Sequence, residues 1–417
     1  MKYSVQKISK DVMKLYNQKL LLRILKDEGP ISRSDLSKMT DLTLPAISEI
    51  TKELESLNLI HNIGESRINR GRFPTMYQLK VDAFKVIGVT IRSNSIRVGL
   101  MNMTGEILYD KEQAQLNTQP EIIADAVSSL VDTILQEANT KKSEIRGIGL
   151  GMHGIVDAVN GISVYPPHLN WDNVPIRTLL EARIQLPVLV DNDCNTLALA
   201  EYWFGGGRNL NSFITLNVDY GIGAGIVVDG NLFHGRDFGA GQIGHVAISD
   251  NGPLCTCGKY GCLEALSSEN AIIETIQKKV KQGYPSSIKE IEGNPEKITI
   301  HHILHAAAAG DELTLNTLNH AAHYLGIGIS MLVNLFNPDK VIITGAVIGF
   351  KEYVLGTLKE TFNRNALKTN VTHFELAASQ LGDKADVLGA GSLWINELFK
   401  GNSSLTDLLH ENKPVSL

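Results

Sequence analysis

Apolar residues at helical spacing predict three short helices in the first 80 residues. These helices cover residues 17–28, 35–39 and 44–57. The first ends at Gly29-Pro30, because glycine and proline interrupt the helical pattern. Ser34 and Thr43 stand where side-chain oxygens would cap the second and third helices. A helix, a short helix, a turn and a longer helix in this order are typical of a helix-turn-helix domain.

Two short apolar segments at 59–62 and 76–79 follow, and they predict paired strands around a basic tip. The arginines of this tip are Arg67, Arg70 and Arg72. They would make a wing that contacts phosphates or a narrow minor groove. On the third helix, the side chains expected to face DNA are Thr43, Ser48 and Lys52. Few of these are strong base readers, so we expect the wing and DNA shape to carry much of the specificity. The alternative is a three-helix packing module with a solvated basic loop.

Beyond residue 80, longer strands and helices of mixed type are predicted. Residues 86–100 predict two strands joined by a turn, and residues 340–346 a buried strand that runs into a glycine turn. Residues 306–336 predict two helices broken near Gly326-Ile-Gly328. Residues 387–399 predict a last apolar helix that packs back on the first part of the body. Residues 401–417 are polar, and a flexible tail is expected there.

Charge separates the head, residues 1–80, from the rest of the chain. The head carries 14 Lys and Arg against 9 Asp and Glu, a net charge of +5, and the remainder carries 25 against 36, a net charge of −11. This division indicates a polyanionic partner for the head only. The 417 residues, of which 43% are hydrophobic, suffice for two or three domains. No apolar run approaches the roughly 18 residues of a membrane span and the first residues are polar, so a cytoplasmic protein without membrane insertion is expected, associated with the nucleoid when bound to DNA.

Three of the four cysteines lie within eight positions, ten residues after a histidine. Together these residues, His245, Cys255, Cys257 and Cys262, are the ligand set of a closed tetrahedral zinc site. Such a site would be structural, because no position is left open for water. The alternatives are small buried cysteines or a disulfide pair, although a charged, glycine-rich loop does not favour buried cysteines and a cytoplasmic chain keeps its thiols reduced.

The segment 241–264 resembles the signature of the ROK family (repressors, uncharacterised reading frames and sugar kinases). It contains the family's Cys-x-Cys-Gly-x-x-Gly-Cys-x-Glu, and Gln242 stands where the family usually has glutamate. Further family motifs recur in order from Val86 to about Leu398. The resemblance implies an α/β fold with a winged helix-turn-helix over 1–80 and a two-lobed actin-like (ribonuclease H-like) body over 81–400. The first lobe would comprise 81–193 with the C-terminal helix, and the second lobe 194–385.

The two segments that resemble the family's ATP-phosphate elements both depart from them. In the first hairpin Thr90 replaces an aspartate, and residues 92–94 replace two glycines and a threonine. A phosphate cradle needs unobstructed backbone N–H groups, so this one is expected to be lost. In the second element, Asp219-Tyr220 precedes the glycines and would repel or block a triphosphate. ATP binding is therefore not expected.

The sugar-binding elements are better matched. The resemblance implies the following sugar contacts: His153, His168, Asn170, Asn192, Asp193, Gln242, His245 and Glu264. Asp193 occupies the position of the kinase base and would be vestigial. Carboxylates and amides suit sugar hydroxyls, which both donate and accept hydrogen bonds. A metal on one ring nitrogen of His245 would orient the other toward the ligand. The alternative is that Asn192, Asp193 and Glu264 merely cap helices or satisfy loops.

These observations favour a sugar-responsive repressor that binds operator DNA as a homodimer, because two heads on a pseudo-palindromic site need a dimer. The sugar would be a monosaccharide or a derivative. One alternative is an active ROK sugar kinase with a regulatory head, which the aspartate at 193 favours. Another is a repressor controlled by a transport-system protein, as in some relatives.

Overall fold

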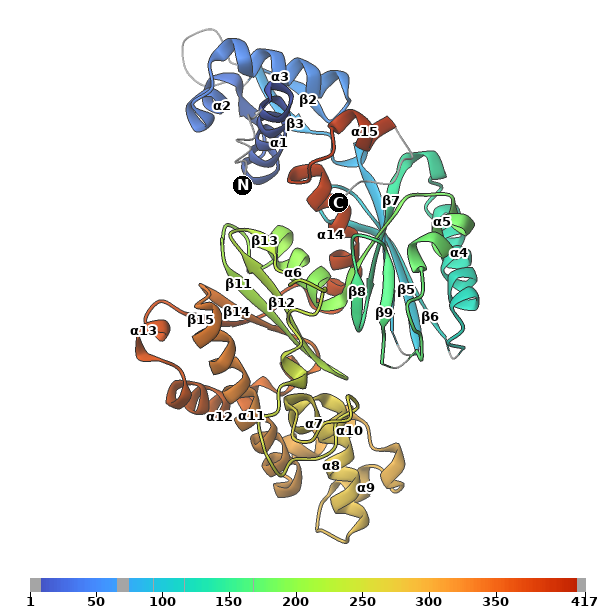
Figure 1. Cartoon of the computed structure of the whole chain (residues 1–417), viewed down its shortest axis with the longest axis vertical. Helices are drawn as coiled ribbons and strands as arrows, with labels where there is room; N and C mark the ends of the chain where they lie inside the picture. The colour runs from blue at the N-terminus through green and yellow to red at the C-terminus, as the bar shows by residue number, and fades with distance from the viewer. Residues whose placement is uncertain (1–8, 66–74, 93, 116, 168, 411–417) are drawn as a thin grey trace, which may run out of the picture. The chain divides into compact units, whose positions relative to one another are not determined.

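The computed structural model describes residues 9–65, 75–92, 94–115, 117–167 and 169–410. Contacts divide the chain into two compact units, Met1–Asp191 with Asp386–Leu417, and Asn192–Ala385. The chain therefore crosses between the units twice, after 191 and after 385. Each unit contains a five-stranded sheet, and the first also contains the head (Figure 1). Four residues predicted to take part in sites lie outside the described residues, namely Arg67, Arg70, Arg72 and His168.

The head has the predicted order of helices, followed by two paired strands. Its elements are α1 (Lys10–Glu28), β1 (Ile31–Ser32), α2 (Arg33–Thr40), α3 (Leu44–Ser56), β2 (Ile60–Glu65) and β3 (Thr75–Leu79). Thr43 caps α3 as predicted, since its hydroxyl accepts from the backbone N–H of Ala46. The predicted cap Ser34 is wrong: Ser32 accepts from Asp35 N at 3.2 Å, and α2 begins earlier. β1, which pairs with β3, was not predicted because two residues carry no periodic pattern.

The first unit contains a sheet in the order β6-β5-β4-β7-β10. Its strands are β4 (Lys85–Ile91), β5 (Ser95–Met101), β6 (Ile107–Ala114), β7 (Ile145–Met152) and β10 (Val188–Asn192). The predicted hairpin over 86–100 is confirmed as β4 and β5, which pair antiparallel. Helices α4 (Pro120–Glu137) and α5 (Ile176–Ile184) pack on one face of this sheet, as Figure 1 shows. A small hairpin, β8 (Ile155–Asp157) with β9 (Ile162–Tyr165), follows β7.

Helix α14 (Ala385–Phe399) covers the other face of this sheet at very short range. A Cβ atom on Gly88 of β4 would lie 2.1 Å from the carbonyl oxygen of Val387, and one on Gly149 of β7 would lie 1.9 Å from that of Ala390. Glycine is needed at both positions because helix and strand backbones are in direct contact. The prediction that the last apolar helix packs on the first lobe is confirmed.

The second unit repeats the same strand arrangement, in the order β13-β12-β11-β14-β15. Its strands are β11 (Phe213–Val218), β12 (Ile222–Val228), β13 (Asn231–Leu232), β14 (Lys340–Thr344) and β15 (Glu375–Ala378). In each unit an antiparallel meander of three strands is extended by two further strands on the side of its first strand. This duplicated mixed sheet is the actin-like architecture that the resemblance implied, and the expected fold class is confirmed.

Helices cover both faces of the second sheet. Helix α6 (Asp193–Phe204) packs against β12 and β11. The opposite face carries the main core of the unit, built with α7 (Leu263–Ser267), α8 (Glu269–Lys281), α10 (Ile300–Ala308), α11 (Glu312–Phe336) and α12 (Lys351–Asn365). Two short helices, α9 (Ile288–Ile291) and α13 (Lys368–Val371), complete the unit.

The predicted helix break near Gly326-Ile-Gly328 is wrong, because α11 runs through it without interruption. The break lies at Gly310, between α10 and α11, where φ is +81°. Gly326 instead allows close packing: a Cβ there would lie 2.8 Å from the carbonyl oxygen of Leu358 in α12. The glycine is thus required by a neighbouring helix and not by a turn.

The expectation of a flexible tail over all of 401–417 is also wrong in part. Residues Leu405–His410 form helix α15, whose Leu405 and Leu408 are buried. Arg146 donates a hydrogen bond of 2.6 Å to the carbonyl oxygen of Leu409. Among the described residues, no helix combines the length and the apolar character that crossing a bilayer requires.

Candidate functional site

The four predicted metal ligands converge in the second unit. The nitrogen and sulfur atoms of His245, Cys255, Cys257 and Cys262 lie within 4.8 Å of one another. His245 Nδ1 is 3.5 Å from Cys255 Sγ, and the Sγ atoms of Cys257 and Cys262 are 3.6 Å apart. A tetrahedral site with zinc–sulfur bonds of about 2.3 Å has sulfur atoms about 3.8 Å apart. The donor set and its spacing therefore fit a single tetrahedral metal ion.

The backbone holds this cluster by tight turns. Cys255 N donates to Lys259 O at 2.8 Å, and Leu263 N donates to Val246 O at 3.0 Å, so the cysteine turn is fastened to the histidine segment. Gly261 has φ +72°, and a Cβ there would lie 1.7 Å from the carbonyl oxygen of Ser249. Glycine is therefore obligatory at this turn.

Burial and the neighbouring thiols raise the pKa of Cys262 to about 12 when no metal is bound. A metal would displace the thiol proton, since the thiolate is the ligand. Cys257 differs because it is exposed, whereas Cys255 and Cys262 are buried. Substituting Cys257 therefore removes a donor with little loss of packing.

The predicted sugar contact Glu264 lies beside the metal cluster. Its Oε1 is 4.0 Å from His245 Nδ1 and accepts from Thr256 Oγ1 at 3.2 Å, and its Oε2 accepts from Ile222 N at 3.1 Å. Glu264 thus ties the cysteine turn to the start of β12. The Nδ1 of His245 faces the sulfur atoms, which leaves Nε2 as the ring nitrogen for a ligand. Gln242 precedes this histidine by one short turn, in which His245 N donates to Gln242 O.

Asn192 and Asp193 lie at the start of α6. The Oδ1 of Asn192 caps the helix by accepting from Cys194 N at 2.9 Å and Asn195 N at 3.4 Å. Cys194 N also donates to Asp193 Oδ1 at 2.9 Å. The capping alternative therefore applies to both side chains, and both are half-buried.

The glycines of β12 are required by α6 packing. A Cβ on Gly223 would lie 2.6 Å from Cys194 Sγ, and one on Gly225 would lie 2.1 Å from the carbonyl oxygen of Cys194. Burial, helped by the charge of Asp193, raises the pKa of the Cys194 thiol well above its usual value. Cys194 is thus a small buried residue, as predicted.

The candidates in the first unit lie on two loops. His153 follows β7 directly and is half-buried, and Asn170 is exposed with φ +55°. The loop of Asn170 is anchored by Trp171, a buried ring whose Nε1 donates to Thr118 O at 2.6 Å. His153 and Asn170 belong to one compact unit, and the other described sugar candidates belong to the second.

Charged side chains pair at the hairpin that resembles the family's ATP-phosphate element. Arg92 Nη2 donates to Asp386 Oδ2 at 2.7 Å, and Thr90 Oγ1 donates to the same oxygen at 3.2 Å. Arg97 Nη1 lies 3.6 Å from Asp386 Oδ1. Asp386, in the first turn of α14, was not predicted as a functional position, because its partners are almost 300 residues away in the sequence.

An acidic pair stands at the second phosphate element. Burial and the neighbouring Asp219 raise the pKa of Glu269 to about 7. Glu269 N also donates to Asp219 O at 2.9 Å. At neutral pH Glu269 is therefore partly protonated, and the charge of Asp219 beside it keeps this place negative. This charge opposes a bound triphosphate.

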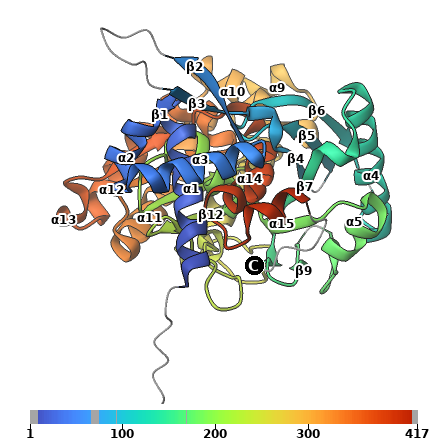
Figure 2. The same cartoon turned by 90° about the horizontal axis from the view of Figure 1, so that it is seen from above.

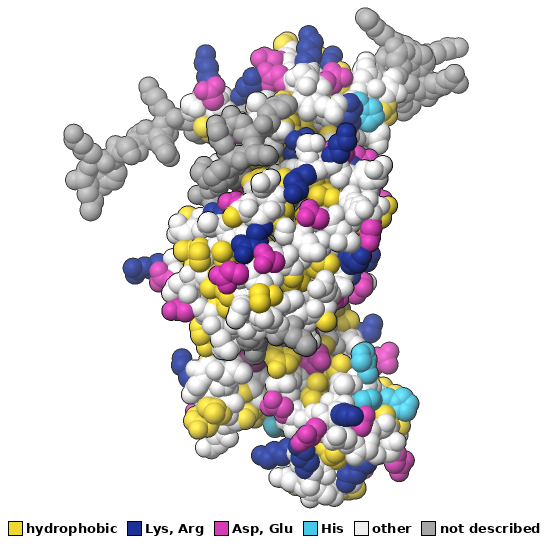
Figure 3. Space-filling model, turned by 90° about the vertical axis from the view of Figure 1, so that its right-hand side faces the viewer, with side chains coloured by type: hydrophobic (Ala, Val, Ile, Leu, Met, Phe, Trp, Pro, Cys, Tyr) yellow, Lys and Arg dark blue, Asp and Glu magenta, His cyan; other side chains and the backbone are white. Residues whose placement is uncertain are grey.

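The outward face of α3 carries the predicted DNA-facing side chains. Thr43 and Lys52 are exposed and Ser48 is half-buried, whereas Ile47, Ile50 and Leu54 are buried on the opposite face. Leu44 beside Thr43 is 55% exposed, and it was not predicted to face DNA because apolar residues were assigned to the core. An apolar side chain at this place suits contact with a thymine methyl group. On the face drawn in Figure 3, the head shows Lys and Arg side chains near the top, with acidic ones among them.

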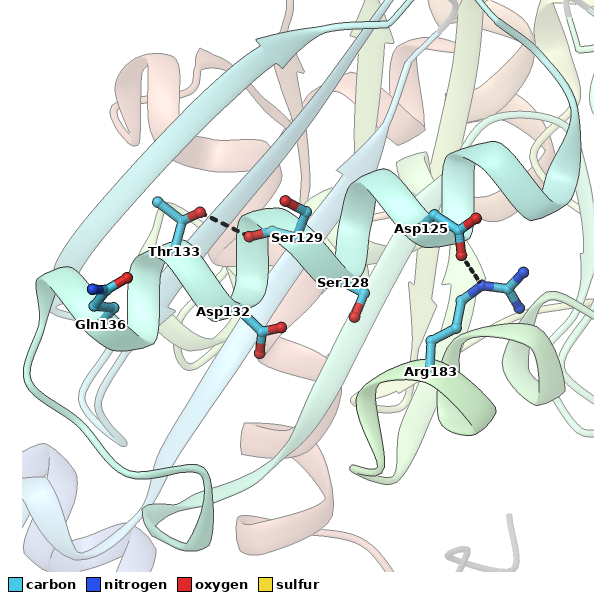
Figure 4. A pocket seen from close by; sticks show the side chains of 7 residues that line it. All are labelled: Asp125, Ser128, Ser129, Asp132, Thr133, Gln136 and Arg183. Atoms are coloured by element: carbon cyan, nitrogen blue, oxygen red, sulfur yellow. Dashed lines mark hydrogen bonds and ion pairs between the residues drawn. The ribbon is translucent and has the colours of Figure 1, made fainter.

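A polar hollow on the first unit is unrelated to these sites. Figure 4 shows it along α4, with Arg183 of α5 paired to Asp125. Its lining residues are Asp125, Ser128, Ser129, Asp132, Thr133, Gln136 and Arg183. It is an exposed helix face, and its lining includes no predicted site residue.

Comparisons with known proteins give separate matches for the head and for the body. Residues 86–397 match the profile of the ROK family, and residues 15–61 match a winged helix-turn-helix DNA-binding profile. The xylose repressor of Caldicellulosiruptor bescii is 33% identical over 388 residues, which are 93% of this chain and 97% of that protein. The transcriptional dual regulator NagC of Escherichia coli K12 is 28% identical over 391 residues, 94% of this chain and 95% of that protein.

Two solved structures are also similar. A ROK family transcriptional regulator, a homologue of the E. coli MLC protein, has a TM-score of 0.83 and 28% identity, and covers 95% of this chain and 99% of its own. A ROK glucokinase from Streptomyces griseus, in complex with glucose and AMPPNP, has a TM-score of 0.67 and 30% identity, and covers 74% of this chain and 98% of its own. Because the family match spans the whole two-lobed body and a winged helix-turn-helix precedes it, the chain belongs to the ROK family.

Proposed function

We propose that this protein is a sugar-responsive transcriptional repressor of carbohydrate-metabolism genes. The observation that carries the proposal is the ion pair of Arg92 with Asp386 at the first phosphate element, in a chain whose residues 15–61 match a winged helix-turn-helix. The names of the relatives, a xylose repressor and NagC, support the same reading. The protein would act in the cytoplasm, on the nucleoid.

Operator DNA and a sugar would bind to different parts of the chain and influence each other through linkage. A sugar releases DNA only if it prefers a body conformation that misplaces the heads for the operator. Two heads at fixed spacing require a homodimer on a pseudo-palindromic site. D-xylose and N-acetylglucosamine are the first sugars to test, since relatives act as xylose or N-acetylglucosamine repressors by name.

The residues proposed to contact sugar hydroxyls are those that the family resemblance implied. From the second unit, these are Asn192, Asp193, Gln242, His245 and Glu264. From the first unit, they are His153 and Asn170, together with His168 outside the described residues. The hydrogen bonds of Asn192 to the α6 backbone fix its amide, and Ile222 N fixes Glu264, so these groups are held in place before a sugar arrives.

We propose zinc as the metal of the His245 cluster, with a structural role. Zinc prefers the Cys₃His donor set, and the four donors leave no open coordination position. The metal would hold the cysteine turn against the histidine segment. His245, with Nδ1 on the metal side, then presents Nε2 in a single tautomer.

The purified protein is expected not to transfer phosphate from ATP to D-xylose, glucose or N-acetylglucosamine. Arg92 stands at the first phosphate element and is paired with Asp386, and the Asp219–Glu269 pair opposes negative charge at the second. A coupled assay with ATP and magnesium measures this, with a ROK glucokinase as the positive control. Sugar-dependent turnover above background would establish the kinase alternative.

Replacing Arg70 or Arg72 by alanine is expected to weaken operator binding with little effect on thermal stability. Each arginine would contribute a phosphate or minor-groove contact. The slope of the logarithm of the binding constant against the logarithm of the salt concentration should therefore become shallower by about one per lost phosphate contact. Binding is measured by fluorescence anisotropy on duplex DNA selected from a random pool by the wild-type protein. Normal operator binding by both variants at physiological salt would refute the wing prediction.

The proposed function itself is tested with the same selected DNA. The operator affinity of the wild-type protein is measured with and without D-xylose and N-acetylglucosamine. A sugar-dependent change establishes the sensor. If neither sugar, nor a wider panel of pentoses, hexoses and amino sugars, changes the affinity while a purified transport-system protein does, control by that protein is the correct alternative.

A further inference from the structure

Helix α14 contacts three parts of the first unit, namely the hairpin β4–β5, the sheet and the DNA-binding head. Its first turn holds Asp386, which accepts from Thr90 and Arg92 at the end of the hairpin β4–β5. The chain enters α14 directly from the second unit, because Ala385 is the last residue of that unit. Its middle lies on β4 and β7 through Gly88 and Gly149, with backbone against backbone. Any displacement at its first turn would thus move the helix as a rigid body over its length of about 22 Å.

The last turn of α14 is held by a lysine from the DNA-binding head. Lys19 of α1 donates two hydrogen bonds of 2.6 Å, to the carbonyl oxygens of Glu397 and Gly401. Carbonyls at a helix C-terminus lack intrahelical partners and carry partial negative charge, so an ammonium group is favoured there. Figure 2 draws the C-terminal end of α14 near α1.

This contact is buried and charged. Lys19 is 4% exposed, and Glu397, whose carboxylate lies near it, is 6% exposed. Burial lowers the pKa of Lys19 to about 8, although Glu397 opposes the shift. Lys19 is therefore mostly protonated at neutral pH. A buried ammonium with two short hydrogen bonds holds one geometry, unlike an exposed ion pair.

Helix α1 continues the connection to the recognition helix. Lys14 and Gln18, on the same helix as Lys19, both donate to the carboxylate of Glu53 in α3, at 2.5 and 2.8 Å. The chain itself joins head and body at 80–84, between β3 and β4. Lys19 thus connects α14 to α1, and Glu53 connects α1 to α3.

We propose that Lys19 is a positioning residue that couples the sugar-binding body to the DNA-binding head: it fastens α1 to the C-terminal end of α14, so that movement of α14 moves the recognition helix. This inference rests on the proposed function, because it assigns the path by which a sugar changes operator affinity. Coupling between binding sites is reciprocal, so operator DNA must change sugar affinity by the same factor through the same contact.

The test compares Lys19→Met with Lys10→Met. Methionine keeps most of the volume of the lysine side chain without its charge. Lys10 lies on the same helix and is exposed, so Lys10→Met matches the change in net charge without touching α14. For each protein, operator affinity is measured with and without D-xylose or N-acetylglucosamine, and sugar affinity is measured by calorimetry with and without operator.

Wild type and Lys10→Met are expected to show the same ratio between operator affinity without sugar and operator affinity with sugar. For coupled sites this ratio is typically about 5- to 150-fold. Lys19→Met is expected to bind the sugar normally, while its operator affinity changes by less than about twofold on sugar addition. Faster hydrogen exchange in the last turn of α14 should accompany this loss. A Lys19→Met ratio equal to the wild-type ratio would overturn the inference and leave the proposed function intact.

A second variant covers the case in which Lys19→Met leaves the Glu397 charge buried and fails to fold. Lys19→Met combined with Glu397→Gln removes both charges with little change in shape, and the same loss of coupling is expected. If this double variant also fails to fold, Lys19 is a structural residue and the inference is wrong. If the wild-type protein responds to no sugar, the proposed function fails, and the inference fails with it.

Discussion

Cys257→Ser is expected to abolish zinc binding and to lower the midpoint of thermal unfolding by roughly 5–10 °C. Cys257 is exposed, so the substitution itself costs little packing and the effect reports the metal. Without zinc, the thiols of Cys255 and Cys262 stay protonated and buried, and the cysteine turn loses its attachment to His245. Zinc content is measured by plasma emission spectrometry and stability by calorimetry.

The control for this prediction is Cys194→Ala, which removes the one cysteine outside the cluster and should retain zinc. A chelator should lower the stability of the wild-type protein to that of Cys257→Ser and should have no effect on Cys257→Ser. Loss of zinc is also expected to weaken sugar binding, because His245 then samples more than one orientation. Unchanged metal content in Cys257→Ser would refute the ligand set.

Asp193→Asn is expected to weaken sugar binding by about tenfold to a hundredfold. The sugar concentration that changes operator binding should rise by the same factor. A hydrogen bond from a sugar hydroxyl to a carboxylate contributes about 1.5–3 kcal/mol, and an amide oxygen replaces only part of it. Asparagine still offers an Oδ1 to Cys194 N, so the start of α6 should remain intact. Sugar affinity is measured by calorimetry, and folding by the midpoint of thermal unfolding.

The matched control is Glu274→Gln, which exchanges a carboxylate for an amide at an exposed position of α8 in the same unit. It should leave sugar affinity and stability unchanged. If Asp193→Asn binds sugar normally, Asp193 serves as a helix residue only, and the capping alternative is correct. Operator affinity without sugar should be the same in both variants, because neither lies in the head.

Features that depend on neighbours in sequence were predicted well. The hydroxyl of Thr43 caps α3 because the capping bond joins residues three apart, and the strands of the hairpin β4–β5 are neighbours within one short segment of the chain. The metal cluster is also local, since its four donors fall within 18 positions, and the structure brings them together as the spacing indicated. Each family motif from residue 86 onward is also a short local segment, so the order of these motifs identified the duplicated body.

Errors arose where two local solutions compete. Ser32 and Ser34 both precede α2, and only the pairing of β1 with β3 places Ser32 at the helix start. Gly326 resembles a helix break in sequence, but the close approach of α12 makes it a packing position. The polar composition of 401–417 suggested a tail, whereas Leu405 and Leu408 are buried in α15.

The sequence by itself determined the family, the winged head, the metal donors and the loss of the phosphate glycines, because each is written in residues close together along the chain. Only the tertiary structure decided which carboxylate pairs with Arg92 at the first phosphate element and which carbonyl groups accept from Lys19 of the head. Asp386 lies 294 positions from Arg92, and Glu397 lies 378 positions from Lys19. Hydrophobic periodicity describes one face of one element, so it carries no information about which distant carboxylate or carbonyl a buried cation meets. That choice is made when α14 packs on its sheet and places both of its ends.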